Sequence, residues 1–225
     1  MLDPETQTLL ESCGHYGKSR LREVDARSGR VQRSQPVDAS VFAEGIAVVG
    51  EARERVLMLT WREGRALHFD RATLRPHATL APHPIRTHTG EGWGVASTGT
   101  VLAVSDGSEY LDLWDAATLR HLQRLRVTDA ETGQPVPRIN ELEFAGPHEL
   151  MANIWFDDRI ARIDVRTAAV VGWYDLHGVL QRHGDASGRP EVLNGIAFDP
   201  SSGDIFVTGK YWKSTFRFQR TPAEE

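Results

Sequence analysis

The sequence has little of several features that would narrow its class. Its 225 residues contain one cysteine, Cys13, which excludes an intrachain disulfide framework and a metal site built from several cysteines. The net charge of −5 includes no basic surplus, so neither a nucleic-acid footprint nor a polybasic membrane patch is indicated. No apolar run approaches the about 18 residues of a membrane helix, and residues 1–5 lack the pattern of a signal peptide. We expect a soluble protein with small or peptidic partners and predict no compartment.

Helical periodicity is also weak, and an internal repeat stands in its place. An aspartate follows a short alternating apolar stretch at Asp25, Asp70, Asp115 and Asp164, with spacings of 45, 45 and 49 residues. A period of this length is typical of propeller blades or solenoid units. In the second unit we expect four strands, over residues 44–49, 55–61, 65–70 and 75–80. The turns carry Glu63-Gly64, Asp106-Gly107 and Asp157-Asp158, which suit hairpins.

Four short antiparallel strands per unit predict an all-β, five-bladed β-propeller, and we expect residues 1–225 to form this one domain. The first blade is incomplete, because stepping back from Tyr16, the rough equivalent of Trp61, reaches Met1 before an inner strand is found. The fifth blade ends without an obvious fourth strand. We therefore expect the first inner strand and the closing strand of the last blade to be missing at the N-terminus. The hypothesis is that the true start lies upstream and that Met1 is an internal methionine.

Two sets of polar and aromatic positions recur with the blades. In four units the third strand closes at Asp70, Asp115, Asp164 and Gln219. Nine residues before these positions lie Trp61, Asp106, Trp155 and Lys210. A further 15 to 17 residues back lie Glu44, Glu91, Asn140 and Asn194, which open the inner strands. Since inner strands of a propeller run in the same sense, equivalent positions should gather at one end of the channel and form a pocket.

Other readings of single residues stay open. Trp114 and Trp173 are candidates for core packing, the repeated aspartates for turn formation, and both asparagines for bonding to loop backbone. His77, His83 and His88 lie on a predicted inter-blade loop without ligand spacing, so metal binding there is not favoured. Cys13 beside His15 is a conceivable nucleophile, although a lone cysteine is more often inert.

Several motifs, taken in order, resemble the plant and bacterial type of glutaminyl-peptide cyclotransferase, a five-bladed propeller family. The resemblance runs from about Glu11 to Phe218. The motifs are "FAEGIAV", "LTW", "EGWGVA", "VSDGS", "NELEF", "ANIW", "RIARID", "VLNGIAFD" and "VTGKYW".

The resemblance implies conversion of N-terminal glutamine in peptides or proteins to pyroglutamate with release of ammonia. It implies Glu44 as the proton shuttle, with Asn140 and Lys210 polarising the carboxamide and holding the oxyanion or amine. Phe42, Trp61, Trp93 and Trp155 would form the aromatic walls, and Glu91 and Asn194 would have supporting roles. We expect no catalytic metal and no cofactor, although a structural ion in the channel stays open, and we expect a monomer. Members of the family are often exported.

One departure from the family concerns the first blade. The family carries a Phe-Thr-Gln-Gly-like motif on that inner strand, and the present sequence begins after it, so we expect weakened stability and an incomplete pocket. Two alternatives therefore stay open. One is a non-catalytic propeller that binds peptides or proteins, and the other is a calcium-dependent hydrolase of the lactonase kind.

Overall fold

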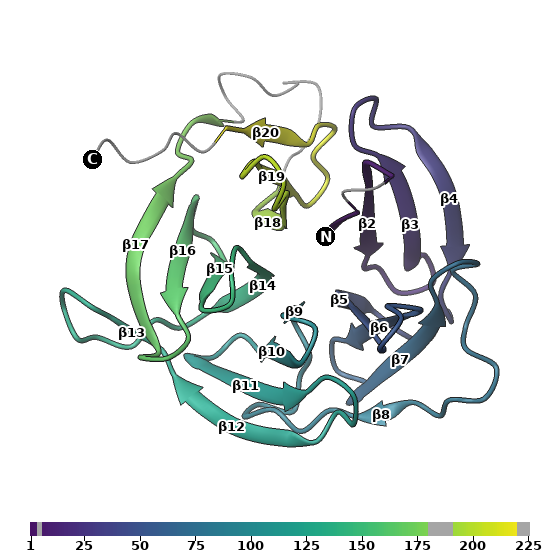
Figure 1. The fold of residues 1–225 in the computed structure, drawn as a ribbon, viewed down its shortest axis with the longest axis horizontal. Helices are drawn as coiled ribbons and strands as arrows, with labels where there is room; N and C mark the ends of the chain where they lie inside the picture. The colour runs from purple at the N-terminus through teal and green to yellow at the C-terminus, as the bar shows by residue number, and fades with distance from the viewer. Residues whose placement is uncertain (4–5, 180–190, 220–225) are drawn as a thin grey trace.

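The computed structural model of the protein describes residues 1–3, 6–179 and 191–219. These residues form five β-sheets that surround a central channel as the blades of a propeller (Figure 1). The predicted all-β, five-bladed fold is confirmed. No helix in the described ranges is long and apolar enough to span a membrane.

Each blade is a run of antiparallel strands counted outward from the channel. The first blade contains β1 (Leu2–Asp3), β2 (Thr8–Cys13), β3 (Arg20–Asp25) and β4 (Val31–Pro36). The second contains β5 (Ala43–Val49), β6 (Arg55–Thr60), β7 (Arg65–Asp70) and β8 (His83–Pro84). The third contains β9 (Val95–Ser97), β10 (Val101–Ser105), β11 (Tyr110–Asp115) and β12 (His121–Arg126). The fourth contains β14 (Ile139–Phe144), β15 (Glu149–Ile154), β16 (Arg159–Asp164) and β17 (Ala169–Asp175), with β13 (Thr128–Asp129) pairing in parallel on its outer edge. The fifth contains β18 (Leu193–Phe198), β19 (Ile205–Gly209) and β20 (Phe216–Phe218).

The first and fifth blades meet where the ring closes. The inner strand β1, which we expected to be missing, is present as two residues that pair with β2. Residues 191–219 supply three strands of the fifth blade. Leu2 is 4% exposed and packs with Ala197 and Phe206 of the fifth blade, so apolar contact joins these two blades.

The prediction of a fourth strand over residues 75–80 of the second blade is wrong. Residues 75–80 form one isolated bridge, between Phe69 and Pro76, and the outer strand is the two-residue β8. Pro76 lies in this segment and has no amide hydrogen to donate to a strand ladder. Regular pairing therefore stops early, and the chain returns to β7 only at residues 83–84.

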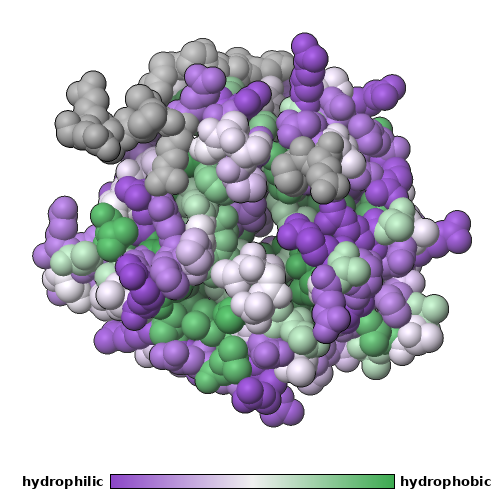
Figure 2. Space-filling model, viewed as in Figure 1, coloured by the Kyte–Doolittle hydropathy of each residue, from purple (hydrophilic) through white to green (hydrophobic). Residues whose placement is uncertain are grey.

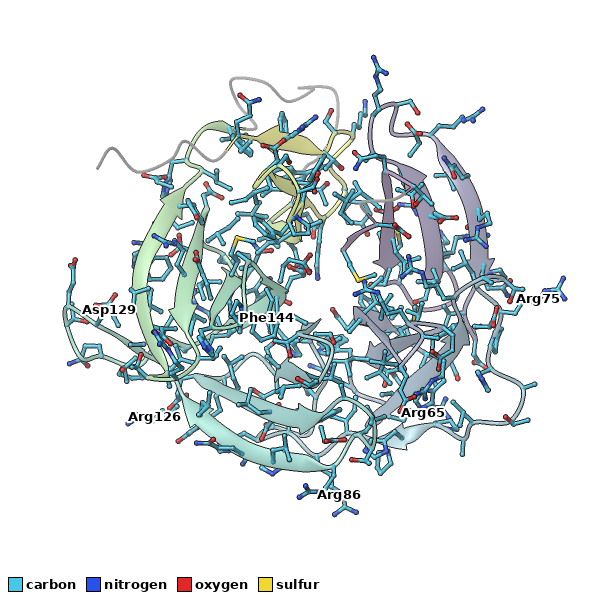
Figure 3. The ribbon with its side chains drawn as sticks, in the orientation of Figure 1. Arg65, Arg75, Arg86, Arg126, Asp129 and Phe144 are labelled. Carbon is cyan, nitrogen blue, oxygen red and sulfur yellow. The ribbon has the colours of Figure 1, made fainter. Side chains whose placement is uncertain are left out.

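The hydrophobic core lies between neighbouring blades. One buried cluster joins Ala103 and Leu111 of the third blade to Leu142 and Leu150 of the fourth. A second joins the second and third blades and includes Trp114, which is 1% exposed, as predicted for a core residue. Since burial of each such side chain stabilises the fold by roughly 1.5–3 kcal/mol, blade packing sets the relative positions of the inner strands. In Figure 3, Arg75, Arg86 and Arg126 lie at the perimeter, whereas Phe144 lies near the centre.

One set of repeated positions is placed as the sequence predicts. Trp61, Asp106, Trp155 and Lys210 each directly follow the second strand of their blade, which ends at residue 60, 105, 154 or 209. In the first blade the second strand ends at Cys13, so Tyr16 lies two residues beyond the equivalent position, in a longer turn.

The other set is predicted correctly at three positions and wrongly at one. Glu44, Asn140 and Asn194 are the second residues of β5, β14 and β18, and a register shift lies at this point in all three strands. A β-bulge re-aims the side chain that it carries. Glu91, in contrast, precedes β9, which begins at Val95 and pairs without a shift. The repeated letters "EG" therefore do not mark equivalent positions in the second and third blades.

Candidate active site

Aromatic side chains from successive blades form two contacting pairs. Phe42 and Trp61 meet edge to face, with ring centroids 5.5 Å apart. Trp93 and Trp155 meet in the same way, with centroids 5.3 Å apart. These are the four side chains expected to form aromatic walls. The structure brings them together as pairs within the ring of blades.

Glu91 joins the two pairs. Its Oε2 atom accepts hydrogen bonds from the indole Nε1 atoms of both Trp61 and Trp93, each at 2.9 Å. Its Oε1 atom accepts a bond from Arg62 Nε at 3.1 Å, and the Arg62 guanidinium lies 3.8 Å from the centroid of the Trp61 ring. Hydrogen bonds to an ionised acceptor are stronger than neutral ones, so Glu91 fixes both indole planes. This geometry gives Glu91 a physical role although its predicted strand position is wrong.

Glu44 has the most perturbed chemistry among the expected site residues. Its side chain is only partly accessible, and burial raises its carboxyl pKa from 4.5 to about 8. Lys210 opposes this rise in the pKa, whereas the charges of Glu91 and Glu63 add to it. A carboxyl group with a pKa near neutrality can both accept and donate a proton, which is what general acid–base chemistry requires.

The neighbouring blades fix the backbone around Glu44. Ser12 Oγ, from the first blade, donates to the Glu44 carbonyl oxygen at 2.5 Å. Gly45 N donates to the Trp93 carbonyl oxygen at 2.7 Å, and a Cβ atom on Gly45 would lie 2.6 Å from the backbone nitrogen of Val95. Only glycine permits this close approach of two inner strands. The main chain at Glu44-Gly45 is therefore held between the first and third blades.

Lys210 lies at a cavity of about 560 Å³ between the fourth and fifth blades. Trp155 also lines this cavity, together with Phe156, Asp157, Asp158, Glu191 and Val192. Lys210 is held by main-chain bonds on both sides, from its own nitrogen to the Val192 carbonyl at 3.0 Å and from Glu191 N to its carbonyl at 2.9 Å. Figure 2 shows that the surface is hollowed at the centre of the ring.

The two predicted asparagines have different surroundings. Asn140 is 5% exposed. Its main-chain carbonyl oxygen accepts a hydrogen bond of 2.5 Å from Ser105 Oγ of the third blade. Asn194 has a buried Oδ1 atom that has no hydrogen-bond partner among the described residues. The peptide that follows Asn194 is fixed by the fourth blade, because Gly195 N donates to Asn153 Oδ1 at 2.9 Å.

Sequence reasoning missed one acidic residue that bonds to Phe42 and two buried acidic residues on the inner strand of the fourth blade. Glu63 accepts bonds from the Tyr16 hydroxyl at 2.9 Å and from Phe42 N at 3.4 Å, although its glycine neighbour made it look like a turn residue. Glu141 and Glu143 alternate along β14, and burial raises the pKa of both carboxyl groups. The period-two spacing in "NELEF" was a signal that both side chains share one face of the strand.

The cysteine and the histidines considered in the sequence analysis contact residues outside this site. Burial and the charge of Glu11 raise the pKa of the Cys13 thiol to about 11, so the thiolate is scarce at neutral pH, and His15 bonds instead to the Tyr16 carbonyl. His83 and His88 lie against different aromatic rings, those of Trp114 and Tyr110. Within the described ranges, no three histidine, cysteine or acidic side chains gather as metal ligands would.

The fold and the site together define a class: five-bladed β-propellers with an inner-strand carboxyl group of raised pKa, a lysine that lines a cavity, and paired aromatic side chains. Comparison with known proteins narrows this class. The model of the family described as glutamine cyclotransferase matches residues 2–219. The chain belongs to the glutamine cyclotransferase family.

Two relatives support this assignment over most of the chain. The glutaminyl-peptide cyclotransferase of Arabidopsis thaliana is 35% identical over 218 residues, which are 94% of this chain and 63% of that protein. The chain thus spans somewhat less than two thirds of that relative. The crystal structure of Myxococcus xanthus glutaminyl cyclase is 31% identical, with a TM-score of 0.78 over 92% of this chain and 84% of that one. Kuenenia stuttgartiensis hydrazine synthase, at 16% identity and a TM-score of 0.54, shares the fold alone.

Proposed function

We propose that this chain converts the N-terminal glutamine of peptides or proteins to pyroglutamate with release of ammonia. The α-amine nitrogen attacks the side-chain carboxamide carbon and forms the lactam bond. The bond from that carbon to the departing nitrogen then breaks. The observation that carries this proposal is Glu44, an inner-strand carboxyl group whose pKa burial raises to about 8 and which feels the charge of Lys210.

The proton balance of the reaction suits one such carboxyl group. The attacking amine must lose a proton and the departing nitrogen must gain one, so a single group can carry the proton between them. General acid–base catalysis works best when the pKa of the catalyst lies near the working pH. Glu44 meets this condition because burial has moved its pKa from 4.5 to about 8.

The oxygen of the tetrahedral intermediate carries developing negative charge. A lysine ammonium or an amide N–H aimed at this oxygen would stabilise it, and we assign these roles to Lys210 and Asn140. The aromatic pairs Phe42–Trp61 and Trp93–Trp155 would hold the flexible glutamine side chain folded back on its own amine. The proposal requires no metal and no cofactor.

The test is ammonia release from a glutamine-initiated peptide by the purified protein, with and without a chelator. We expect release that continues in the chelator and falls strongly in Glu44→Gln. Equal rates for the unchanged protein and Glu44→Gln would remove Glu44 from the mechanism. Loss of activity on chelation alone would favour a metal-dependent hydrolase instead.

A further inference from the structure

Two large aromatic side chains are exposed beside the site. Phe156 follows Trp155 and is 68% exposed, and Tyr211 follows Lys210 and is 66% exposed. Both are the second residue after the second strand of their blade, so they occupy equivalent positions in the fourth and fifth blades. The fold does not bury either side chain.

The backbone at both positions would suit glycine better. Phe156 has a φ of 64° and Tyr211 a φ of 59°, in the left-handed region that side chains with a Cβ atom disfavour. In the third blade the equivalent residue is Gly107, with a φ of 80°. Backbone conformation and core packing therefore give no reason for an aromatic residue at either position.

Phe156 also continues the aromatic surface of the site outward. Its ring stacks on Trp155 at 4.5 Å with an interplanar angle of 28°, and Trp155 in turn contacts Trp93. Phe156, Trp155 and Lys210 line the same cavity of about 560 Å³. A peptide whose first residue reacts beside Lys210 must run outward from that cavity, and Phe156 lies at its border.

We infer that Phe156 and Tyr211 form a binding site for the side chain of the second substrate residue, the one that follows the N-terminal glutamine. The site favours a large apolar or aromatic side chain, because it offers one ring stacked on the pocket wall and a second ring on the neighbouring blade. This inference rests on the cyclotransferase function proposed above.

The experiment compares two peptides, Gln-Phe-Ala and Gln-Gly-Ala, by the kcat/KM of ammonia release. The unchanged protein is expected to prefer Gln-Phe-Ala by about five- to tenfold, the range expected for one aromatic contact. Phe156→Gly and Tyr211→Gly should each move this ratio toward one. Neither should lower Tm, since glycine accepts the left-handed backbone. Val171→Ala, which removes an exposed apolar side chain on β17, is the control and should leave the ratio unchanged.

The outcomes separate this inference from the proposed function. Ammonia release from neither peptide would overturn the function itself, and the inference with it. Release from both peptides at equal kcat/KM, or a preference that survives in both glycine variants, would overturn the binding site alone. An equal loss for both peptides in Phe156→Gly would do the same. Self-association that Phe156→Gly abolishes would assign the two rings to a contact between copies of the chain.

Discussion

The pKa of a carboxyl group is raised on the inner strands and lowered in the outer turns of the same blades. In the outer turns, Asp70 accepts bonds from Thr73 N at 2.8 Å and Thr73 Oγ1 at 2.6 Å, and these bonds lower its pKa. Asp115 has the same two bonds from Thr118, with the same effect on its pKa. On the inner strand, burial raises the pKa of Glu44.

The difference in pKa follows from how well each position stabilises a charged carboxylate. An outer turn surrounds a carboxylate with donors from its own loop and with water, so the charged form is stable. An inner strand takes the carboxyl group away from water and supplies few donors. Glu141, for example, accepts a bond from Ile196 N at 3.1 Å, and burial still raises its pKa well above the ordinary value. One repeat thus yields both turn carboxylates with a lowered pKa and buried carboxyl groups with a raised pKa.

The largest expected effect is that of Glu44→Gln on turnover. Loss of a general acid–base group costs about 10²–10⁴-fold in rate, so ammonia release should fall by that factor. The matched outer variant, Asp70→Asn, should keep the parent rate. If both variants lost activity equally, the contrast between inner and outer carboxyl groups would have no functional meaning.

The same substitution should raise stability at slightly alkaline pH. The folded-state pKa of Glu44, about 8, lies above the unfolded value of 4.5. The neutral form therefore favours the folded state below pH 4.5, and this contribution is lost as the pH rises through 8. Glu44→Gln removes a penalty of up to about 3 kcal/mol at pH 7, which Tm values measured across pH would detect. Identical pH dependence of Tm in the two proteins would contradict the raised pKa.

Lys210→Met should slow the reaction and move its pH profile. Loss of a group that stabilises the oxyanion costs about 10²–10³-fold in kcat. Because Lys210 lowers the pKa of Glu44, its removal should shift the acid limb of kcat/KM to higher pH. Lys213→Met, a nearby change of the same size, is the control. A slow variant with an unchanged pH profile of kcat/KM would show that Lys210 does not affect the pKa of Glu44.

Glu91→Gln should have a smaller effect, with the opposite shift in pH. The charge of Glu91 raises the pKa of Glu44, so its removal should move the acid limb to lower pH. The indole planes of Trp61 and Trp93 lose a charged acceptor, and we expect about a tenfold rise in KM with little change in kcat. Glu109→Gln, which breaks a surface pair with Arg126, should change neither quantity. A shift to higher pH would contradict the assigned geometry.

The smallest expected effect is that of Asp115→Ala on stability. The bonds from Thr118 hold the folded-state pKa of Asp115 below the unfolded value. Its contribution is therefore present above the unfolded pKa and is lost as the pH falls through the folded one. Tm should drop by a few degrees at pH 7, and the difference from the parent should shrink in acid. Glu51→Ala, at an exposed turn carboxylate, should leave Tm unchanged.

The sequence alone predicts the blades and much of the site because hairpin spacing repeats along the chain. Trp61, Trp155 and Lys210 follow their strands as the period requires, and Glu44 opens the inner strand as expected. The period cannot show that Glu91 precedes a shorter inner strand, since the letters "EG" lie within β5 but before β9.

Contacts between blades are also beyond the repeat. The bond from Trp61 to Glu91 depends on how the second and third blades pack, and the sequence of neither repeat unit indicates this packing. The left-handed backbone at Phe156 is equally invisible, because an aromatic residue there contradicts local preference. The same left-handed backbone also occurs away from the site, at Leu74, Leu119 and Ala168 in the turns before the outer strands, so the local sequence does not mark it as a site feature.

The hydrogen bonds that serine hydroxyls donate from one blade to the next limit how blades can be exchanged by recombination or engineering. Ser12 of the first blade fixes the peptide at Glu44 of the second, and Ser105 of the third fixes the peptide at Asn140 of the fourth. A blade transplanted by itself would leave behind the serine that orients its own pocket residue. The unit that can be exchanged is therefore the second strand of one blade together with the inner strand of the next. Recombination would keep the pocket intact only where it transfers these two strands together.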